Sequence, residues 1–200
     1  MKYPEFFDKI DPIIVRDELA SFLGVNDDGL IDISYVDIVK IAGHSCATVA
    51  GAYLMTLYGL RALYKDEIPN RGDIKVELQK NPKDDNTGVV GWVISNITGA
   101  TTDYGFGGIP TGEFNRRYLL FYGASIDYDV VFTRLDTNKK VGVNYTPRKI
   151  VNPMAILKSA IAKDAKEEDI KSFPKRFQTM VQTVFENSDK VIEVVELWRV

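Results

Sequence analysis

The sequence predicts an α+β fold, in which a mostly antiparallel sheet of about five strands packs against a long central helix, with further helices at both ends. Apolar residues recur at helical spacings before residue 65 and alternate with a period of two between residues 73 and 145. Helical spacings return after residue 153. We expect a single domain over residues 1–200, with a helical lead-in over 1–33, a core over 34–150 and a C-terminal helical extension over 151–200.

The composition of the chain argues against several classes of protein. Hydrophobic residues make up 45% of the 200 residues and include ten Tyr, ten Phe and two Trp, enough for a sizeable core. The formal net charge is −3 and no basic block is present, so we expect no nucleic-acid partner. No apolar run reaches the ~18 residues of a membrane span, and the start of the chain lacks the layout of a signal peptide. These two features predict no membrane partner. One cysteine permits no intramolecular disulfide, so we expect a cytoplasmic protein.

The first part of the chain has the apolar spacing of helices. Pro12 suits the first turn of a helix, so residues 5–24 predict two short helices that separate near Asp11. Residues 26–29 have the chemistry of a turn, and they lack the terminal glutamate of an EF-hand calcium loop. Ser34 is then expected to cap a helix, with Asp37 as its capping-box partner.

A second, longer helix is expected to begin at His44–Ala47 and to run to about Tyr64. Gly51 and Gly59 lie on it, among several alanines. Small residues at such positions let another backbone approach closely, so this helix is predicted to be central and buried.

The period of the pattern changes from helical to two at Asp73. The predicted strands are Ile74–Leu78, Val89–Thr98, Tyr118–Tyr122, Asp127–Leu135 and Lys140–Tyr145, with a hairpin turn at Thr137 and Asn138. Beyond Pro153 we expect helices, the last of them with Pro174 near its first turn. Residues 191–197 fit either period, and their β-branched content favours a strand.

The only histidine and the only cysteine, His44 and Cys46, stand two positions apart at the start of the long helix. One interpretation makes Cys46 a small buried apolar residue and His44 a hydrogen-bonded cap residue. The other makes them metal ligands, which requires His44 in the preceding turn and Cys46 in the first helical turn. The positive end of the helix favours thiolate there, and thiolate with imidazole suits Zn²⁺ or a similar transition metal. The remaining ligands would be carboxylates such as Asp103 or Glu113, water, or a dimer partner.

A glycine-rich loop, Gly99–Gly112, is the second candidate site. Its exposed backbone amides could hold an anion, with Thr101, Tyr104 and Arg116 as the side chains nearest to such a ligand. The loop contains neither the GxGxxG pattern nor a lysine-bearing P-loop, which argues against a nucleotide. The alternative is a long sheet connection whose glycines adopt positive φ angles.

Nucleophilic catalysis is hard to assemble from this sequence. A Ser-His-Asp site would have to use His44, and no G-x-S-x-G elbow supports it. A dyad of Cys46 and His44 is conceivable, but adjacent cap residues rarely orient as a nucleophile and a base.

The segment Gly43-His44-Ser45-Cys46, followed by a long helix of small residues, resembles the Gly-His-x-Cys-Pro-Gly signature of the FmdE proteins. These proteins take their name from a gene in the operon of the molybdenum formylmethanofuran dehydrogenase. Residues 98–101, Thr-Gly-Ala-Thr, are similar to the family's Thr-Gly-Cys-Thr segment, and the likeness covers roughly residues 36–150. The resemblance implies an α+β core, a homodimer and a metal-binding active site around the His and the Cys.

Two departures separate the chain from that pattern. Ala47 replaces the proline of the signature, and Ala100 stands where relatives commonly carry a second cysteine. The paired cysteines of the family's C-terminal zinc finger are also missing. The resemblance therefore reduces the metal site in this chain to His44 and Cys46.

These observations lead to three hypotheses. The first is an FmdE-like protein whose transition metal, expected to be zinc, lies at His44 and Cys46 and opens onto the glycine-rich loop. In an enzyme, that metal would polarise a substrate oxygen or activate water, with Asp103 or Glu113 as proton carriers. The second is a metal-independent module in which Tyr104, Phe106 and Arg116 of the glycine-rich loop region hold a small organic anion or cofactor, and His44 only hydrogen-bonds it. The third is an assembly protein whose Gly51/Gly59 helix forms a dimer interface.

Overall fold

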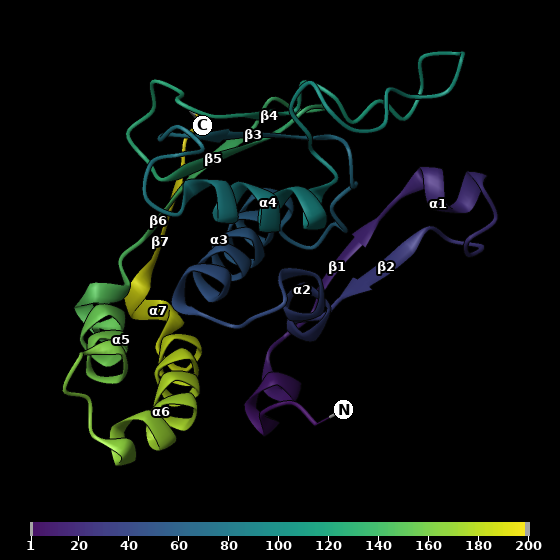
Figure 1. Ribbon diagram of the computed structural model, residues 1–200. Coiled ribbons are helices and arrows are strands. Elements are labelled where there is room, and N and C mark those ends of the chain that lie inside the picture. The colour runs from purple at the N-terminus through teal and green to yellow at the C-terminus, as the bar shows by residue number, and fades with distance from the viewer. Residues whose placement is uncertain (1, 199–200) are drawn as a thin grey trace.

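The centre of the fold is a five-stranded sheet packed against the helix α3 (Ala47–Tyr64) (Figure 1). The computed structural model describes residues 2–198. The strands follow the order β4 (Leu120–Phe121), β3 (Ile74–Leu78), β5 (Val130–Arg134), β6 (Lys140–Tyr145) and β7 (Ile192–Glu196). The strands β3 and β4 pair in parallel, and the other neighbours pair antiparallel. The predicted α+β class, with its mostly antiparallel sheet, is confirmed.

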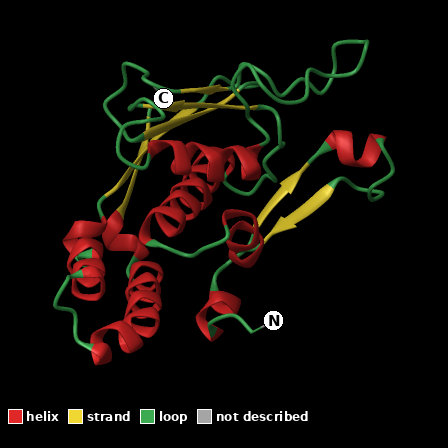
Figure 2. Ribbon diagram, in the orientation of Figure 1, coloured by secondary structure: helices red, strands yellow, loops and turns green. Residues whose placement is uncertain are grey.

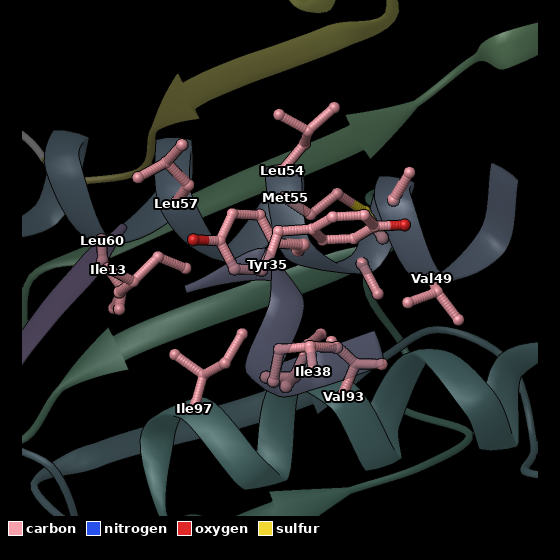
Figure 3. Packing of buried hydrophobic residues seen from close by; sticks show 14 of the residues in the cluster. Ile13, Tyr35, Ile38, Val49, Leu54, Met55, Leu57, Leu60, Val93 and Ile97 are labelled. Carbon is pink, nitrogen blue, oxygen red and sulfur yellow. The ribbon is translucent and has the colours of Figure 1, made fainter. Parts of the chain in front are cut away.

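Helix α3 is central and buried, as its small residues predicted. A Cβ atom on Gly51 would meet the ring of Tyr145, and one on Gly59 would meet the ring of Phe132. The close neighbours of these glycines are therefore aromatic rings from the sheet. Figure 3 shows the core around this helix, where Tyr35 and Ile38 pack among side chains of α3 and α4.

Helix α4 (Thr87–Thr98) packs beside α3, so the strand predicted over Val89–Thr98 is wrong. The segment is rich in valine and isoleucine, which favours a strand when propensity is considered alone. Its buried residues nevertheless follow helical spacings, as Gly91, Ile94 and Thr98 show. Trp92 is partly exposed on the opposite side. Packing on α3 outweighs the local propensity, and Gly99 ends the helix with a φ of 75°.

A hairpin of β1 (Ile13–Arg16) and β2 (Leu30–Ile33) projects from the body and carries α1 (Glu18–Phe22) at its tip (Figure 2). In the helical lead-in expected over residues 5–24, only the 3₁₀ helix η1 (Glu5–Lys9) and α1 are helical. The strand β1 lies between them, so the prediction is wrong there. Ile13 and Val15 are buried while Ile14 is 48% exposed, which is the alternation of a strand. Pro12 precedes this strand and starts no helix. The predicted turn at 26–29 is present, since Asn26 accepts a hydrogen bond from the Gly29 N–H.

The central strands follow the sequence pattern more closely. Strand β6 has the predicted bounds, while β5 and β4 are shorter than the segments predicted for them. Asn138, in the predicted hairpin turn between β5 and β6, has a φ of 57°. The predicted terminal strand is present as β7, which pairs with β6.

The C-terminal part is helical, as expected. It contains η2 (Pro147–Lys149), α5 (Pro153–Ile161), α6 (Glu167–Glu186) and the short α7 (Ser188–Val191). Pro174 lies inside α6 and not in its first turn, because the helix begins earlier, at the acidic residues Glu167 to Asp169. Within residues 2–198, none of the helices is both long and apolar enough to cross a membrane.

Helix α2 (Tyr35–Ala42) begins with the predicted capping box. The Ser34 hydroxyl accepts a hydrogen bond from the Asp37 N–H at 3.2 Å, and the Asp37 carboxylate accepts one from the Ser34 N–H at 3.1 Å. The hydrogen bond from the Ser34 hydroxyl is the main reason that the pKa of Asp37 lies below its ordinary value. This box positions α2 and so the turn that carries His44.

We expect Ser34→Ala to lower the free energy of unfolding by about 1 kcal/mol at neutral pH, because the first turn loses its cap. The pKa of Asp37 is lower in the folded state than in the unfolded state. The carboxylate therefore contributes stability above its unfolded pKa, and this stability is lost as the pH falls through the folded-state pKa. Urea unfolding should therefore show a difference between wild type and variant that shrinks below about pH 4. Ser34→Thr, which keeps the hydroxyl, is the control. Equal stability of the alanine variant and the wild type at neutral pH would contradict this prediction.

Candidate functional site

The two rare residues lie in the connection between α2 and α3. Gly43 ends α2 with a φ of 74°, and His44 follows it in an exposed turn. The His44 Nδ1–H donates to the Ala42 carbonyl at 3.0 Å. Cys46 is the N-cap of α3, and its Sγ accepts a hydrogen bond from the Val49 N–H at 3.5 Å. The chain thus places His44 in the turn and Cys46 at the helix start.

These two residues do not complete a metal site by themselves. Within residues 2–198 there is no group of three or more His, Cys, Asp or Glu side chains that could hold a metal ion. A structural zinc takes four protein ligands, and a catalytic zinc commonly takes three. A metal at His44 and Cys46 would therefore need further ligands from outside the described residues.

Two tyrosines surround the start of α3. Tyr35 shares a hydrogen bond of 2.9 Å with the buried Ser45 hydroxyl, and the Tyr145 hydroxyl donates to the Ala47 carbonyl at 2.8 Å. Burial is the main cause that raises the pKa of both phenols above the ordinary value, and the nearby Cys46 adds to it. Both phenols therefore stay protonated at neutral pH and act as hydrogen-bonding groups.

A cavity of about 270 Å³ lies where the first turns of α3 and α4 meet; we call it the α3–α4 cavity. Its polar lining residues are Thr48, Lys80, Asp85, Asn86, Thr87, Asp129 and Tyr145, and its apolar ones are Met55, Leu78, Val90 and Pro147. Tyr145 connects the cavity to the start of α3, since its hydroxyl bonds the Ala47 carbonyl. The cavity thus adjoins the helix start that Cys46 caps.

The cavity combines helix N-termini with one cation, Lys80, and two anions, Asp85 and Asp129. Asn86 Nδ2 donates to the Thr48 hydroxyl at 3.2 Å and so links the two helix starts. The N–H groups of Thr48 and Gly88, in the first turns, have no acceptor among the described residues. Lys80 forms an ion pair of 2.6 Å with Asp85, and the hydrogen bond between them raises the pKa of Lys80.

Asp129 is the remaining charged group of the cavity. It accepts a hydrogen bond of 2.8 Å from the Tyr145 N–H through one oxygen. The cavity therefore offers donors at the helix starts and an acceptor at Asp129.

The glycine-rich loop lies away from this cavity. It begins at the C-terminal end of α4, while the α3–α4 cavity lies at the N-terminal end. Because α4 has 12 residues, these ends are about 18 Å apart. Figure 1 shows the loop running outward from the body on the side of α1. The structure does not bring the loop together with His44 and Cys46.

The other predicted site residues lie in or next to that loop. Asp103 and Tyr104 are exposed, and Glu113 accepts a hydrogen bond from the Thr111 hydroxyl. The Thr101 hydroxyl donates to the Arg116 carbonyl at 2.7 Å. Arg116 itself is buried against Asp17, at 2.6 Å, and its guanidinium holds the base of the loop.

Sequence reasoning missed Lys80, Asp129, Asn86 and Tyr145 as members of one cavity. They come from three parts of the chain, since Lys80 and Asn86 share the connection between β3 and α4, and no spacing in the sequence links that connection to Asp129 or Tyr145. The one available signal was the polar run before Thr87, which indicates a helix start once α4 is recognised. A comparison of the chain with known protein families and with curated proteins finds no match.

Proposed function

We propose that this protein binds a small organic anion in the α3–α4 cavity. The observation that carries this proposal is the meeting of two helix N-termini at one cavity, where Thr48 has a backbone N–H without an acceptor among the described residues. The first turn of a helix carries partial positive charge and unpaired N–H donors, so it favours a carboxylate or another anionic group. The sequence led us to expect such a ligand at the glycine-rich loop, and we propose the α3–α4 cavity as its site instead.

The lining of the cavity narrows the class of ligand. Lys80 is neutralised by Asp85, so the helix starts are the main attraction for an anion. Asp129 would repel a second anionic group, and it favours a hydroxyl or amino group on the ligand. Met55, Leu78 and Val90 provide a floor for a short carbon chain. These features support a hydroxy- or amino-substituted carboxylic acid of a few carbons.

A second candidate is the FmdE-like transition-metal site at His44 and Cys46, with zinc as the metal. One observation favours it: the His44 Nδ1–H is held by a backbone carbonyl, which is how proteins orient a histidine that ligates a metal through its other nitrogen. A second copy of the chain, in a homodimer, or water would supply the missing ligands. A single cysteine, which cannot form an intramolecular disulfide, supports a cytoplasmic location.

One titration separates the two candidates. Untagged protein is titrated in one series with L-lactate and L-serine, and with L-malate as a diacid that Asp129 should disfavour, and in another series with Zn²⁺, Ni²⁺ and Fe²⁺. Binding is measured by calorimetry and by the shift in melting temperature. We expect a hydroxy or amino acid to bind. Thr48→Val leaves the backbone N–H in place but removes the cavity-lining hydroxyl, which accepts from Asn86 and can donate its own proton to the ligand. The variant should therefore weaken binding about two- to tenfold, the effect of one lost hydrogen bond. Thr111→Val, in the exposed part of the glycine-rich loop, is the matched control.

The alternative outcomes are distinct. Binding of a metal that is lost in both Cys46→Ala and His44→Ala, without any response to the acids, would support the metal site and contradict the anion site. Acid binding that Thr48→Val leaves unchanged would also contradict the anion site in this cavity.

A further inference from the structure

A second cavity, of about 220 Å³, lies on another face of α3, between η1 and the end of α6; we call it the η1–α6 cavity. Its walls come from η1 and the residues after it, from the second half of α3, and from α6 and α7. On α3, the residues Leu54, Leu57 and Arg61 face it, whereas Thr48 and Met55 face the α3–α4 cavity. These two sets follow separate helical stripes, so the two cavities are independent sites.

The floor of the η1–α6 cavity is apolar and partly aromatic. Phe6, Leu54 and Leu57 are buried side chains at its base. The rings of Phe6 and Phe185 lie 6.3 Å apart at their centroids, in a tilted arrangement. An apolar cavity of roughly 150 Å³ is enough to hold benzene. The η1–α6 cavity therefore has room for one aromatic ring or for a branched aliphatic group.

Three pairs of polar groups at the rim hydrogen-bond to each other, and two charges there have no counter-ion among residues 2–198: the Lys9 ammonium and the Glu186 carboxylate. Arg61 pairs with Asp11 at 2.8 Å, and Gln182 donates to Glu186 at 2.7 Å. The Tyr58 and Ser188 hydroxyls share a hydrogen bond of 2.8 Å. The Lys9 ammonium has neither an ion-pair partner nor a hydrogen-bond acceptor among residues 2–198. An exposed cation at the edge of an apolar floor complements an anion that carries an apolar body.

We propose that the η1–α6 cavity binds a small carboxylate with an aromatic or branched aliphatic body. The body fills the floor formed by Phe6, Leu54 and Leu57, and the carboxylate meets the ammonium of Lys9. Burial of the apolar body provides most of the affinity, and the ion pair selects the acid over a neutral molecule of the same shape. A plain carboxylic acid and an α-amino acid share this chemistry, and the amino group of the latter would face Glu186.

The test is a titration of the full chain, followed by ¹H–¹⁵N NMR and calorimetry, with 3-phenylpropionate, L-phenylalanine and the neutral 3-phenyl-1-propanol. We expect amide shifts in η1, in the second half of α3 and at the end of α6, and about fivefold weaker binding of the alcohol than of the acid. Lys9→Met, a change at an exposed residue, should remove that preference for the acid. Lys2→Met, which removes an exposed lysine that does not line the cavity, should keep it.

Each outcome decides the proposal. Binding of either acid that is weakened by Lys9→Met supports it, and the tighter of the two identifies the source as a plain acid or an amino acid. Two outcomes would overturn it: no shift at the cavity residues at millimolar ligand, or an unchanged affinity for both acids in Lys9→Met. A response confined to the first turns of α3 and α4 would place the acids in the α3–α4 cavity and would also overturn it.

Discussion

Replacement of Asp17 by alanine is expected to lower the free energy of unfolding by about 3–5 kcal/mol, the cost of leaving a buried charge without its partner. Asp17 is 3% exposed and lies at the end of β1, where it caps α1 through the Leu19 N–H. One of its oxygens accepts from Arg116 at 2.6 Å, and the other accepts from Arg71 at 2.7 Å. A single carboxylate thus balances two guanidinium groups.

The size of this effect follows from the burial of Arg116, which is 7% exposed. Burial is the main cause that lowers its pKa, so the protein environment disfavours its charge unless Asp17 is present. Loss of Asp17 would also release the glycine-rich loop from the β1–β2 hairpin, because Arg116 stands at the base of that loop. We therefore expect faster amide hydrogen exchange in the loop as well.

Urea unfolding of the Asp17→Ala variant measures the effect. The matched control is Glu67→Ala, which removes the 66% exposed partner of Arg134. Because Glu67 is exposed and Arg134 keeps Asp136 as a second partner, the loss of Glu67 leaves no charge unpaired and should cost much less than the loss of Asp17. If Asp17→Ala costs no more than Glu67→Ala, the buried cluster does not stabilise the fold as described.

Replacement of Gly51 by alanine is the second large effect, with an expected loss of about 3 kcal/mol, near the upper end for overpacking of a core. A Cβ atom at this position would overlap the Cε1 and Cδ1 atoms of the Tyr145 ring. The ring must move, and its hydrogen bond to the Ala47 carbonyl is then lost. Because Tyr145 lines the α3–α4 cavity, the variant should also lose the binding proposed there.

A double-mutant cycle tests the cause. In a Tyr145→Ala background the obstacle is gone, so Gly51→Ala should stabilise the protein by about 1 kcal/mol through its higher helix propensity. The same loss in both backgrounds would show that the ring of Tyr145 is not the reason for glycine at this position.

Local signals in the sequence were reliable where the chemistry is local. The capping box of Ser34 and Asp37 predicted the start of α2, and the alternation over Ile74–Leu78 predicted β3. The turn at Gly43 and the helix start at Cys46 also lie where expected. The helix starts and the turn depend on residues within four positions of one another. The strand β3 is indicated by the alternation of apolar and polar residues along its own length.

The prediction failed where distant packing decides the structure. Residues 89–98 have strand propensity, but their apolar face is covered by α3, which makes them a helix. Ile13 and Val15 have neighbours at helical spacings, but pairing with β2 makes them a strand. Neither contact is visible in the local pattern.

The sequence by itself determined the α+β class, the long central helix and the position of its only histidine and cysteine at that helix start. The tertiary structure alone decided the surroundings of that helix start. It separated the glycine-rich loop from His44 and Cys46, and it assembled a cavity from Thr48, Lys80, Asn86, Asp129 and Tyr145. The physical reason is that a helix start is encoded by neighbouring residues, whereas a cavity is formed by segments that meet only when their apolar faces pack together.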